Sequence, residues 1–164
     1  MPLNPVLGRQ LWGQDMRSGS WSPPETPLLD LARARALKRL PRGQDDPRCL
    51  SERDQTVLAV TSAQSVIDNG GFRYFFENDW PGKPPYSFFS AAYRMIGAEM
   101  PAECIDRAVA LFPFAQPERH EEKRRRFLEA LPESHEVIEL GHRVCGDTSV
   151  WDLLETYVKD HREH

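Results

Sequence analysis

Apolar residues recur at helical spacing through most of the chain after residue 50. One predicted helix begins at Ser51, a residue type that caps helix N-termini, and stops at Asn69-Gly70, because glycine tolerates the left-handed backbone of a helix end. Its apolar positions fall on one face, at Ala59, Val60, Ala63, Val66 and Ile67. No stretch alternates apolar and polar residues over several positions, so the sequence predicts no strand.

The helical spacing returns in later segments that glycine or proline often delimits. These segments cover residues 88–96, 101–112, 137–145 and 150–158, and a polar helix is predicted over 118–131, with apolar residues only at Phe127, Leu128 and Leu131. Gly97, Pro113 and Gly146 follow three of them, and Asp147, Thr148 and Ser149 offer a cap for the last. The pattern predicts an all-α fold, an irregular single-domain bundle of about six or seven helices with short connections.

Residues 1–50 follow a different pattern and predict a Pro-rich N-terminal arm. They carry half of the 14 prolines, including the stretch "SGSWSPPETP", which cannot hold a helix or a central strand. One helix is predicted over Leu28–Leu40, followed by the break "PRGQDDP". Trp12 and Trp21 indicate that the arm packs onto something, and a partly disordered extension is the alternative. The expected division is therefore an arm and linker over 1–50 and a helical domain over 51–164.

Composition places the chain among cytoplasmic proteins of one domain. Its 164 residues are enough for a core, whereas the hydrophobic fraction of 40% is a little low and indicates that part of the chain is not packed. The three cysteines are few and widely spaced, which argues against a disulfide scaffold and for a reducing compartment. No apolar run is long enough to span a membrane, and the first residues do not resemble a secretory signal.

The net charge of −4 is unevenly distributed. Residues 1–50 hold 8 Lys and Arg against 5 Asp and Glu, giving +3, whereas residues 51–164 hold 13 against 20, giving −7. An acidic domain repels nucleic acid and suits a basic protein partner, so no direct contact with nucleic acid is expected. The carboxylates singled out as candidates for binding such a partner are Asp68, Glu77, Asp79, Asp147 and Asp152.

Two side-chain groups on residues 135–145 could carry chemistry. His135, Glu139 and His142 project from one strip of a helix and could hold a metal ion, although no fourth ligand accompanies them and a solvated flank is the alternative. Cys145 with His142 could form a nucleophile and its base. Cys145 is predicted on the buried face, however, where cysteines are mostly inert packing residues, as is Cys104. The sequence therefore predicts no catalytic residue, no metal and no cofactor.

The basic run "EEKRRR" at residues 121–126 could contact phosphate. Acids at helical spacing interleave with it, which is typical of a solvated face with i,i+4 ion pairs. No phosphate-binding loop is predicted either, because "GGF" lacks the later glycine and lysine and no strand precedes it.

The segment "DNGGFRYFFEND", residues 68–79, joins two glycines to a dense aromatic cluster. We refer to it as the glycine–aromatic segment. It could be a ligand-binding loop or the junction between two helices. The junction is favoured: the glycines end one helix, and Phe72, Phe75 and Phe76 start the next as core anchors, with Tyr74 at the edge.

The order of these pieces resembles a family of small helical proteins named for a DNA-mimic protein. The resemblance rests on "DNGGFRYFFEN", "AAYRMIGAE", "CIDRAVALFP", "RRRFLEAL" and "LLETYV", and it covers roughly residues 52–160. The family motif falls on Asn69, Gly70, Gly71, Phe72, Tyr74, Phe75, Asn78 and Gly97. These residues look structural, and no catalytic residue belongs to the family pattern.

The resemblance implies a non-enzymatic interaction module, possible self-association as a homodimer, and imitation of DNA by an acidic face that binds a basic or DNA-binding protein. Two other functions stay open at this point. One is an immunity or regulatory protein that binds its partner through the aromatic stretch and the arm. The other is a metal-dependent enzyme built on His135, Glu139 and His142.

Overall fold

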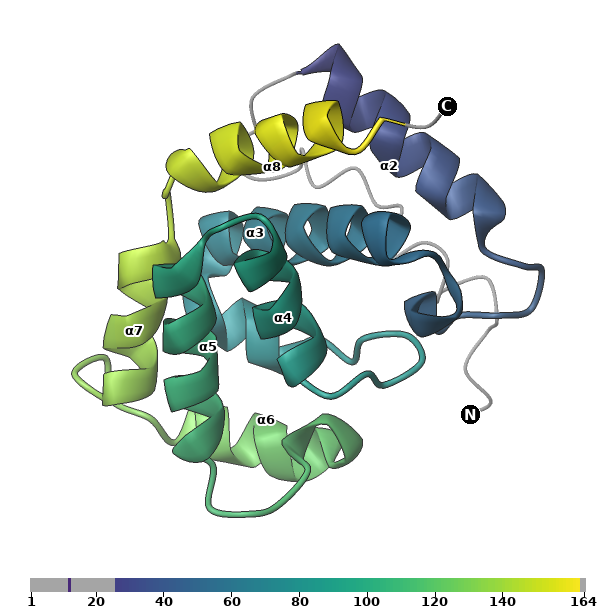
Figure 1. Ribbon diagram of the computed structural model, residues 1–164. Coiled ribbons are helices and arrows are strands. Elements are labelled where there is room, and N and C mark those ends of the chain that lie inside the picture. The colour runs from purple at the N-terminus through teal and green to yellow at the C-terminus, as the bar shows by residue number, and fades with distance from the viewer. Residues whose placement is uncertain (1–11, 13–25, 163–164) are drawn as a thin grey trace.

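The computed structural model describes Trp12 and residues 26–162, and this part of the chain is all-α (Figure 1). It contains seven α-helices, the short 3₁₀ helices η1 and η2, and no strand among the described residues. Their bounds are α2 Pro27–Arg39, η1 Pro47–Cys49, α3 Glu52–Glu77, α4 Ser87–Met95, α5 Glu99–Ala110, η2 Pro117–Arg119, α6 Glu121–Glu129, α7 Glu136–Val144 and α8 Ser149–Asp160. The predicted fold class is confirmed.

Helix α3 lies at the centre of the bundle, and α2, α4, α6, α7 and α8 all pack against it. Figure 1 shows α2 and α8 side by side along one flank of α3, with α4, α5 and α7 on another. The predicted apolar face of α3 is buried, but so are most of its other side chains between Thr56 and Ile67. The two buried threonines bond their own helix: Thr61 Oγ1 donates to the Val57 carbonyl at 2.7 Å and Thr56 Oγ1 to the Glu52 carbonyl at 2.8 Å. Gln64 instead bonds other elements, since its amide donates to the Val144 carbonyl at 3.0 Å.

Several predicted helix boundaries are confirmed. Ser51 caps α3, since its hydroxyl accepts the Asp54 N–H at 3.2 Å. Gly97 and Gly146 follow α4 and α7 with φ of 84° and 75°, where a side chain would strain the backbone. The helix expected over 118–131 is shorter than predicted. A turn of η2 precedes α6, and Gln116 in front of it has a left-handed backbone.

The predicted end of one helix at Asn69-Gly70 and start of the next at Phe72 are confirmed to within one residue, because α3 comprises two helical segments that meet at a kink in this glycine pair. The helix continues to Glu77, and its only residue with non-helical backbone is Gly71, at φ 66° and ψ −158°. This region of backbone space is open essentially to glycine alone. The glycine pair therefore makes a kink within α3, and the second helical segment of α3 starts at Phe72.

The predicted helix over Leu28–Leu40 is confirmed as α2, which packs on α3 and α8. Trp12 is completely buried in the same hydrophobic core as Val57 and Phe89, in agreement with the expectation that the arm packs onto something. Trp21 lies outside the described residues. The division of the chain at residue 50 stays a prediction.

Candidate functional site

The aromatic side chains after the Gly71 kink form the centre of the core. Phe72, Phe75 and Phe76 are all buried, and Phe76 meets both others edge to face, with ring centroids 5.3 and 4.9 Å apart. Trp80 and Phe89 extend the cluster from the following loop and from α4. The prediction that these phenylalanines are core anchors is confirmed, and they are not available to a ligand or partner.

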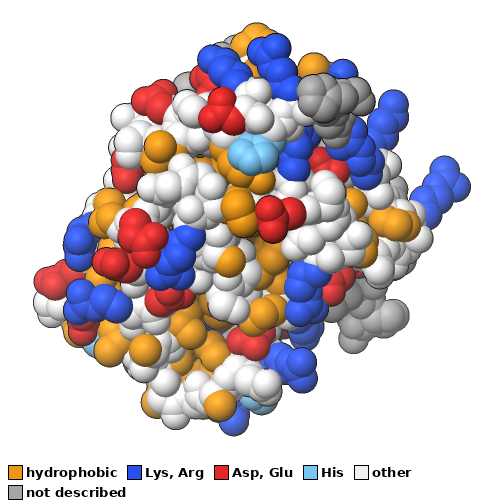
Figure 2. All heavy atoms as spheres, in the orientation of Figure 1, with side chains coloured by type: hydrophobic (Ala, Val, Ile, Leu, Met, Phe, Trp, Pro, Cys, Tyr) orange, Lys and Arg blue, Asp and Glu red, His pale blue; other side chains and the backbone are white. Residues whose placement is uncertain are grey.

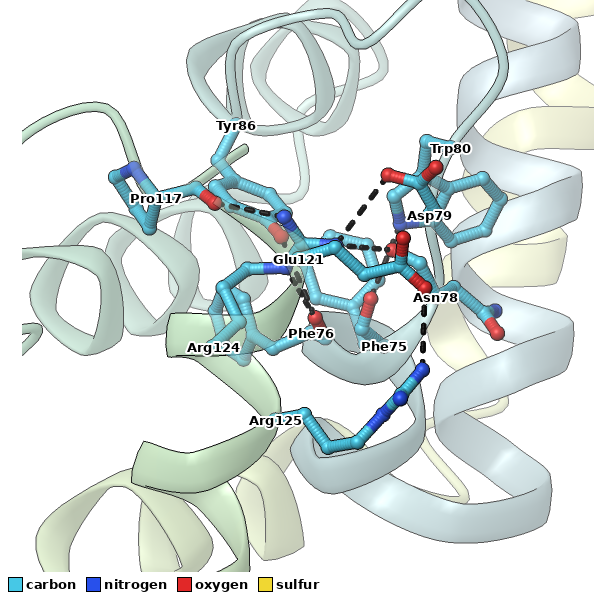
Figure 3. Close-up of polar contacts among 10 residues, drawn as sticks. All are labelled: Phe75, Phe76, Asn78, Asp79, Trp80, Tyr86, Pro117, Glu121, Arg124 and Arg125. Atoms are coloured by element: carbon cyan, nitrogen blue, oxygen red, sulfur yellow. Dashed lines mark hydrogen bonds and ion pairs between the residues drawn. The ribbon is translucent and has the colours of Figure 1, made fainter. Parts of the chain in front are cut away.

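Arg124 closes this end of α3 from the neighbouring helix α6 (Figure 3). Its side chain is 1% exposed, and its guanidinium donates to the carbonyls of Phe76 at 2.9 Å and Pro117 at 2.7 Å. It also lies 3.5 Å from both the Asn78 carbonyl and an Asp79 carboxylate oxygen. The last carbonyls of a helix have no partner within the helix. Arg124 therefore gives the Phe76 carbonyl, at the end of α3, a donor that the helix itself lacks.

The interpretation of "EEKRRR" as a wholly solvated face was wrong for Arg124 alone. Arg125 pairs with Glu121 at 3.1 Å, as Figure 3 shows, and Arg126 lies 3.8 Å from Glu122, so the predicted i,i+4 ion pairs are confirmed. The sequence signal for Arg124 was its position: it precedes Phe127 and Leu128 by three and four residues, which places it on the apolar face of α6.

Asp68 occupies a polar corner on the other side of the kink. Its Oδ1 accepts the Gly146 N–H at 2.7 Å and the Gln64 side-chain amide at 2.8 Å, and its Oδ2 lies 3.4 Å from the indole nitrogen of Trp151. Burial raises the pKa of Asp68, the hydrogen bond from Gly146 opposes this, and the nearby charge of Asp147 adds to the rise. This corner joins α3 to the connection between α7 and α8.

The remaining motif residues have local structural roles. Asn69 donates from its side chain to the Ser65 carbonyl at 2.8 Å, and the Asn78 N–H donates to the Tyr74 carbonyl at 3.2 Å at the end of α3. The Tyr74 ring lies directly over Gly70, where an added Cβ would come within 2.1 Å of it. Tyr74 itself is 53% exposed, so it is at the edge, as predicted.

The five predicted partner-binding acids occupy unlike environments. Glu77 and Asp152 are exposed and have no ion pair within the described residues. Asp68 and Asp147 lie close together, and Asp147 accepts the Ser149 N–H at 3.1 Å at the start of α8. Asp79 lies beyond the kink, beside Arg124. The structure therefore brings together only Asp68 and Asp147 and uses both in internal hydrogen bonds.

The candidate chemical groups of residues 135–145 do not form a site. His135 caps α7, because its Nδ1 accepts the Val137 N–H at 3.1 Å. The described part of the chain contains no group of three His, Cys, Asp or Glu side chains placed to hold a metal ion.

The prediction that Cys145 is buried is wrong. Helix α7 ends at Val144, so Cys145 leaves the apolar face and is exposed. Partial desolvation and the Asp68 charge raise the pKa of the Cys145 thiol, which keeps it protonated and weakly nucleophilic. Cys104 is buried, as expected.

Many surface carboxylates are already neutralised by arginine. Arg94 pairs with Glu99 at 3.0 Å and with Asp106 at 2.7 Å, and Arg107 pairs with Glu136. Figure 2 accordingly shows a face on which acidic and basic side chains alternate. A groove of about 500 Å³ beside α4 holds Arg94 and Asp106 as its ionisable groups, already paired with each other.

Other carboxylates have no ion pair within the described residues. The exposed members of this group, which we call the unpaired carboxylates, are Asp30, Glu52, Glu77, Glu103, Glu129, Glu139, Asp152 and Asp160. They lie on α2, α3, α5, α6, α7 and α8, so they are spread over the molecule and do not belong to one motif. None of the helices that the structure describes is long and apolar enough to cross a bilayer.

Comparison with known proteins gives a single assignment. Neither the curated proteins nor the solved structures include a match to this chain. The family model described as DMP19-like protein matches residues 48–161, which is most of the chain and includes the Gly71 kink, Arg124 and the Asp68 corner. The family takes its name from DNA mimic protein 19. The chain therefore belongs to the DMP19-like protein family.

Proposed function

We propose that the chain is a non-enzymatic interaction module that binds a basic, DNA-binding protein through its unpaired carboxylates. Membership of a DNA-mimic family supports this kind of role at a coarse level. The observation that carries the proposal is the division of surface acids into those neutralised by arginine and those that are exposed without an ion pair.

The two groups of acids differ in what they offer a partner. The charge of Glu136 is balanced by Arg107, whereas Glu139 one turn later has no ion pair in the described chain. A carboxylate without a counter-charge projects a field that attracts a basic surface and accelerates its approach. Within residues 52–162, seven exposed carboxylates lack an ion pair, against five exposed cations: Lys83, Arg119, Lys123, Arg143 and Arg162. Helix α2 and the loop after it have the opposite balance, with Arg35, Lys38 and Arg42 against Asp30.

The alternative of binding through the aromatic stretch receives less support. Phe72, Phe75 and Phe76 are buried in the core, and Tyr74 alone among these aromatic residues is exposed. The metal-dependent alternative also lacks support, because His135 caps a helix and the described residues hold no metal-ligating group.

Capture on the immobilised protein tests the proposal. Proteins of the source cell that bind heparin are passed over the protein and over a matched column carrying an unrelated acidic helical protein. We expect a DNA-binding protein that is retained only by the first column. It should elute with salt, because attraction between exposed charges is screened over about 8 Å at physiological ionic strength. Duplex DNA should also release it. A complex indifferent to both salt and duplex DNA would contradict the proposal.

A further inference from the structure

Trp12 fits into the described core although it lies far outside the family match. The match begins at residue 48, and yet Trp12 is 0% exposed. Its ring stacks on Phe89 with centroids 6.1 Å apart, meets Phe88 edge to face at 6.4 Å and lies 5.2 Å from Trp80. The three surrounding rings all belong to the matched segment. The family domain of this chain therefore contains an aromatic socket that a residue from outside the domain fills.

Polar contacts make the fit specific to tryptophan within a peptide. The indole Nε1 donates to the Asp45 carbonyl at 3.1 Å, a bond that phenylalanine cannot make. The backbone carbonyl of Trp12 accepts from Arg33, with Nε at 3.4 Å and Nη2 at 3.1 Å. The site thus contacts the ring, the indole N–H and the main chain of its occupant. A residue that only filled space in the core would need the first of these contacts alone.

We propose that Trp80, Phe88 and Phe89, with the Asp45 carbonyl and Arg33, form a recognition site for a tryptophan-bearing peptide segment. We call this site the Trp12 socket. Its occupant is the chain's own segment around Trp12, which acts as an intramolecular ligand. This goes beyond the proposed function, because the socket is aromatic and shares no residue with the unpaired carboxylates.

Occupation from within the chain closes the socket to other segments. A ligand tethered by a short stretch of chain acts at an effective concentration on the order of millimolar. A tryptophan segment added from outside must compete with this internal ligand. The apparent affinity of the added segment equals its intrinsic affinity multiplied by the fraction of molecules whose socket is empty. Removal of the Trp12 side chain should therefore create a binding site that the wild-type chain lacks.

The test uses the full-length chain and a fluorescent peptide of residues 6–18, "VLGRQLWGQDMRS". Anisotropy titrations compare wild type, Trp12→Ala and the matched control Trp21→Ala. We expect saturable binding to Trp12→Ala that is at least about tenfold tighter than binding to either of the other chains. A peptide with Phe in place of Trp should bind Trp12→Ala about threefold to tenfold more weakly, through loss of one hydrogen bond. A peptide with Ala at this position should not bind.

A second receptor variant, Trp12→Phe, keeps a ring in the socket and guards against loss of the fold. It should retain the helical circular dichroism of the wild type and bind the Trp peptide more tightly than wild type does. Equal binding of the Trp and Ala peptides to folded Trp12→Ala would overturn the proposal. So would loss of the helical signal in both variants, because Trp12 would then be an integral part of the core and not a replaceable ligand.

Discussion

The glycine–aromatic segment and the unpaired carboxylates are both conspicuous in the sequence, but apart from Glu77, which belongs to both, they face opposite environments. Residues 68–79 turn phenylalanines into the core, and their polar groups bond the chain itself through Arg124, Gly146 and Ser65. The side chains of the unpaired carboxylates, on the outer surface of α2, α3 and α5–α8, make no ion pair in the described chain. The comparison teaches that the residues that identify a family can serve to stabilise its fold, and that residues outside the motif can be the ones that bind a partner. Substitutions in the first region should change stability, and those in the second should change binding.

Phe75→Ala should give the largest loss of stability in the glycine–aromatic segment. Phe75 is completely buried among Phe72, Trp80 and Phe89, and truncation of a buried Phe leaves a cavity that costs about 3–5 kcal/mol. Its neighbour Tyr74 is 53% exposed, so Tyr74→Ala should cost less than about 1 kcal/mol. Urea unfolding of both variants measures the difference. Equal losses would mean that the two sides of this helix do not differ as described.

Arg124→Met should cost about 2–3 kcal/mol in the free energy of unfolding, because it removes two buried charged hydrogen bonds to the carbonyls of Phe76 and Pro117. These carbonyls would keep only the Tyr86 hydroxyl at 3.5 Å and the His120 N–H at 3.1 Å, respectively. Arg125→Met is the matched control on the same helix. Its ion pair with Glu121 is exposed, so its loss should change stability by about 0.5 kcal/mol at most. A control variant as unstable as Arg124→Met would refute a special role for the buried arginine.

Gly71→Ala should cost about 1–2 kcal/mol through backbone strain alone. An added Cβ meets no atom within 4 Å, so the cost comes from φ 66° with ψ −158° and not from a clash. Asparagine, which tolerates the ordinary left-handed region, should not rescue this backbone, and Gly71→Asn should be about as unstable as Gly71→Ala. Thermal unfolding of both variants checks this. Recovery with Asn would show that the kink has a different backbone from the one described.

The pH dependence of stability should separate Asp68 from the surface acids. Burial raises the pKa of Asp68 above its ordinary value of 3.8, so the folded chain binds this proton more tightly than the unfolded chain does. The resulting stabilisation is complete below pH 3.8 and is lost as pH rises through the folded pKa of Asp68. Asp68→Asn cannot titrate, so its stability relative to wild type should improve between about pH 4 and pH 7. A difference that stays constant over this range would show that Asp68 does not titrate abnormally.

The helical order of the chain was predictable because its signals are local. Apolar spacing predicted α3, α4, α5, α7 and α8, and residues that favour helices predicted α2. Gly97 and Gly146 marked two helix ends, because both adopt a positive φ that glycine favours. The aromatic anchors followed from the same spacing. The burial of α3 on nearly all sides did not, because Thr56 and Thr61 look solvent-facing until their hydroxyls are seen to bond the preceding turn.

The site was less predictable, because its contacts join residues far apart in sequence. Arg124 looks like one cation in a basic run, and its role depends on the carbonyls of Phe76, at the end of α3, and of Asn78, just beyond it, which are 48 and 46 residues away. Asp68 reads as a surface acid, and its burial depends on Gly146 and Trp151. Which carboxylates are paired also depends on tertiary contacts, as between Arg107 and Glu136.

The most direct test of the central claim compares two triple variants with the same change in net charge. One neutralises unpaired carboxylates, with Glu77→Gln, Glu139→Gln and Asp152→Asn. The other neutralises paired ones, with Glu99→Gln, Asp106→Asn and Glu136→Gln. Affinity for the captured DNA-binding protein is measured for each across a range of salt concentrations. We predict that the first variant loses about tenfold or more in affinity with a shallower salt dependence, and that the second loses less than about threefold. Equal losses in the two variants would contradict the account.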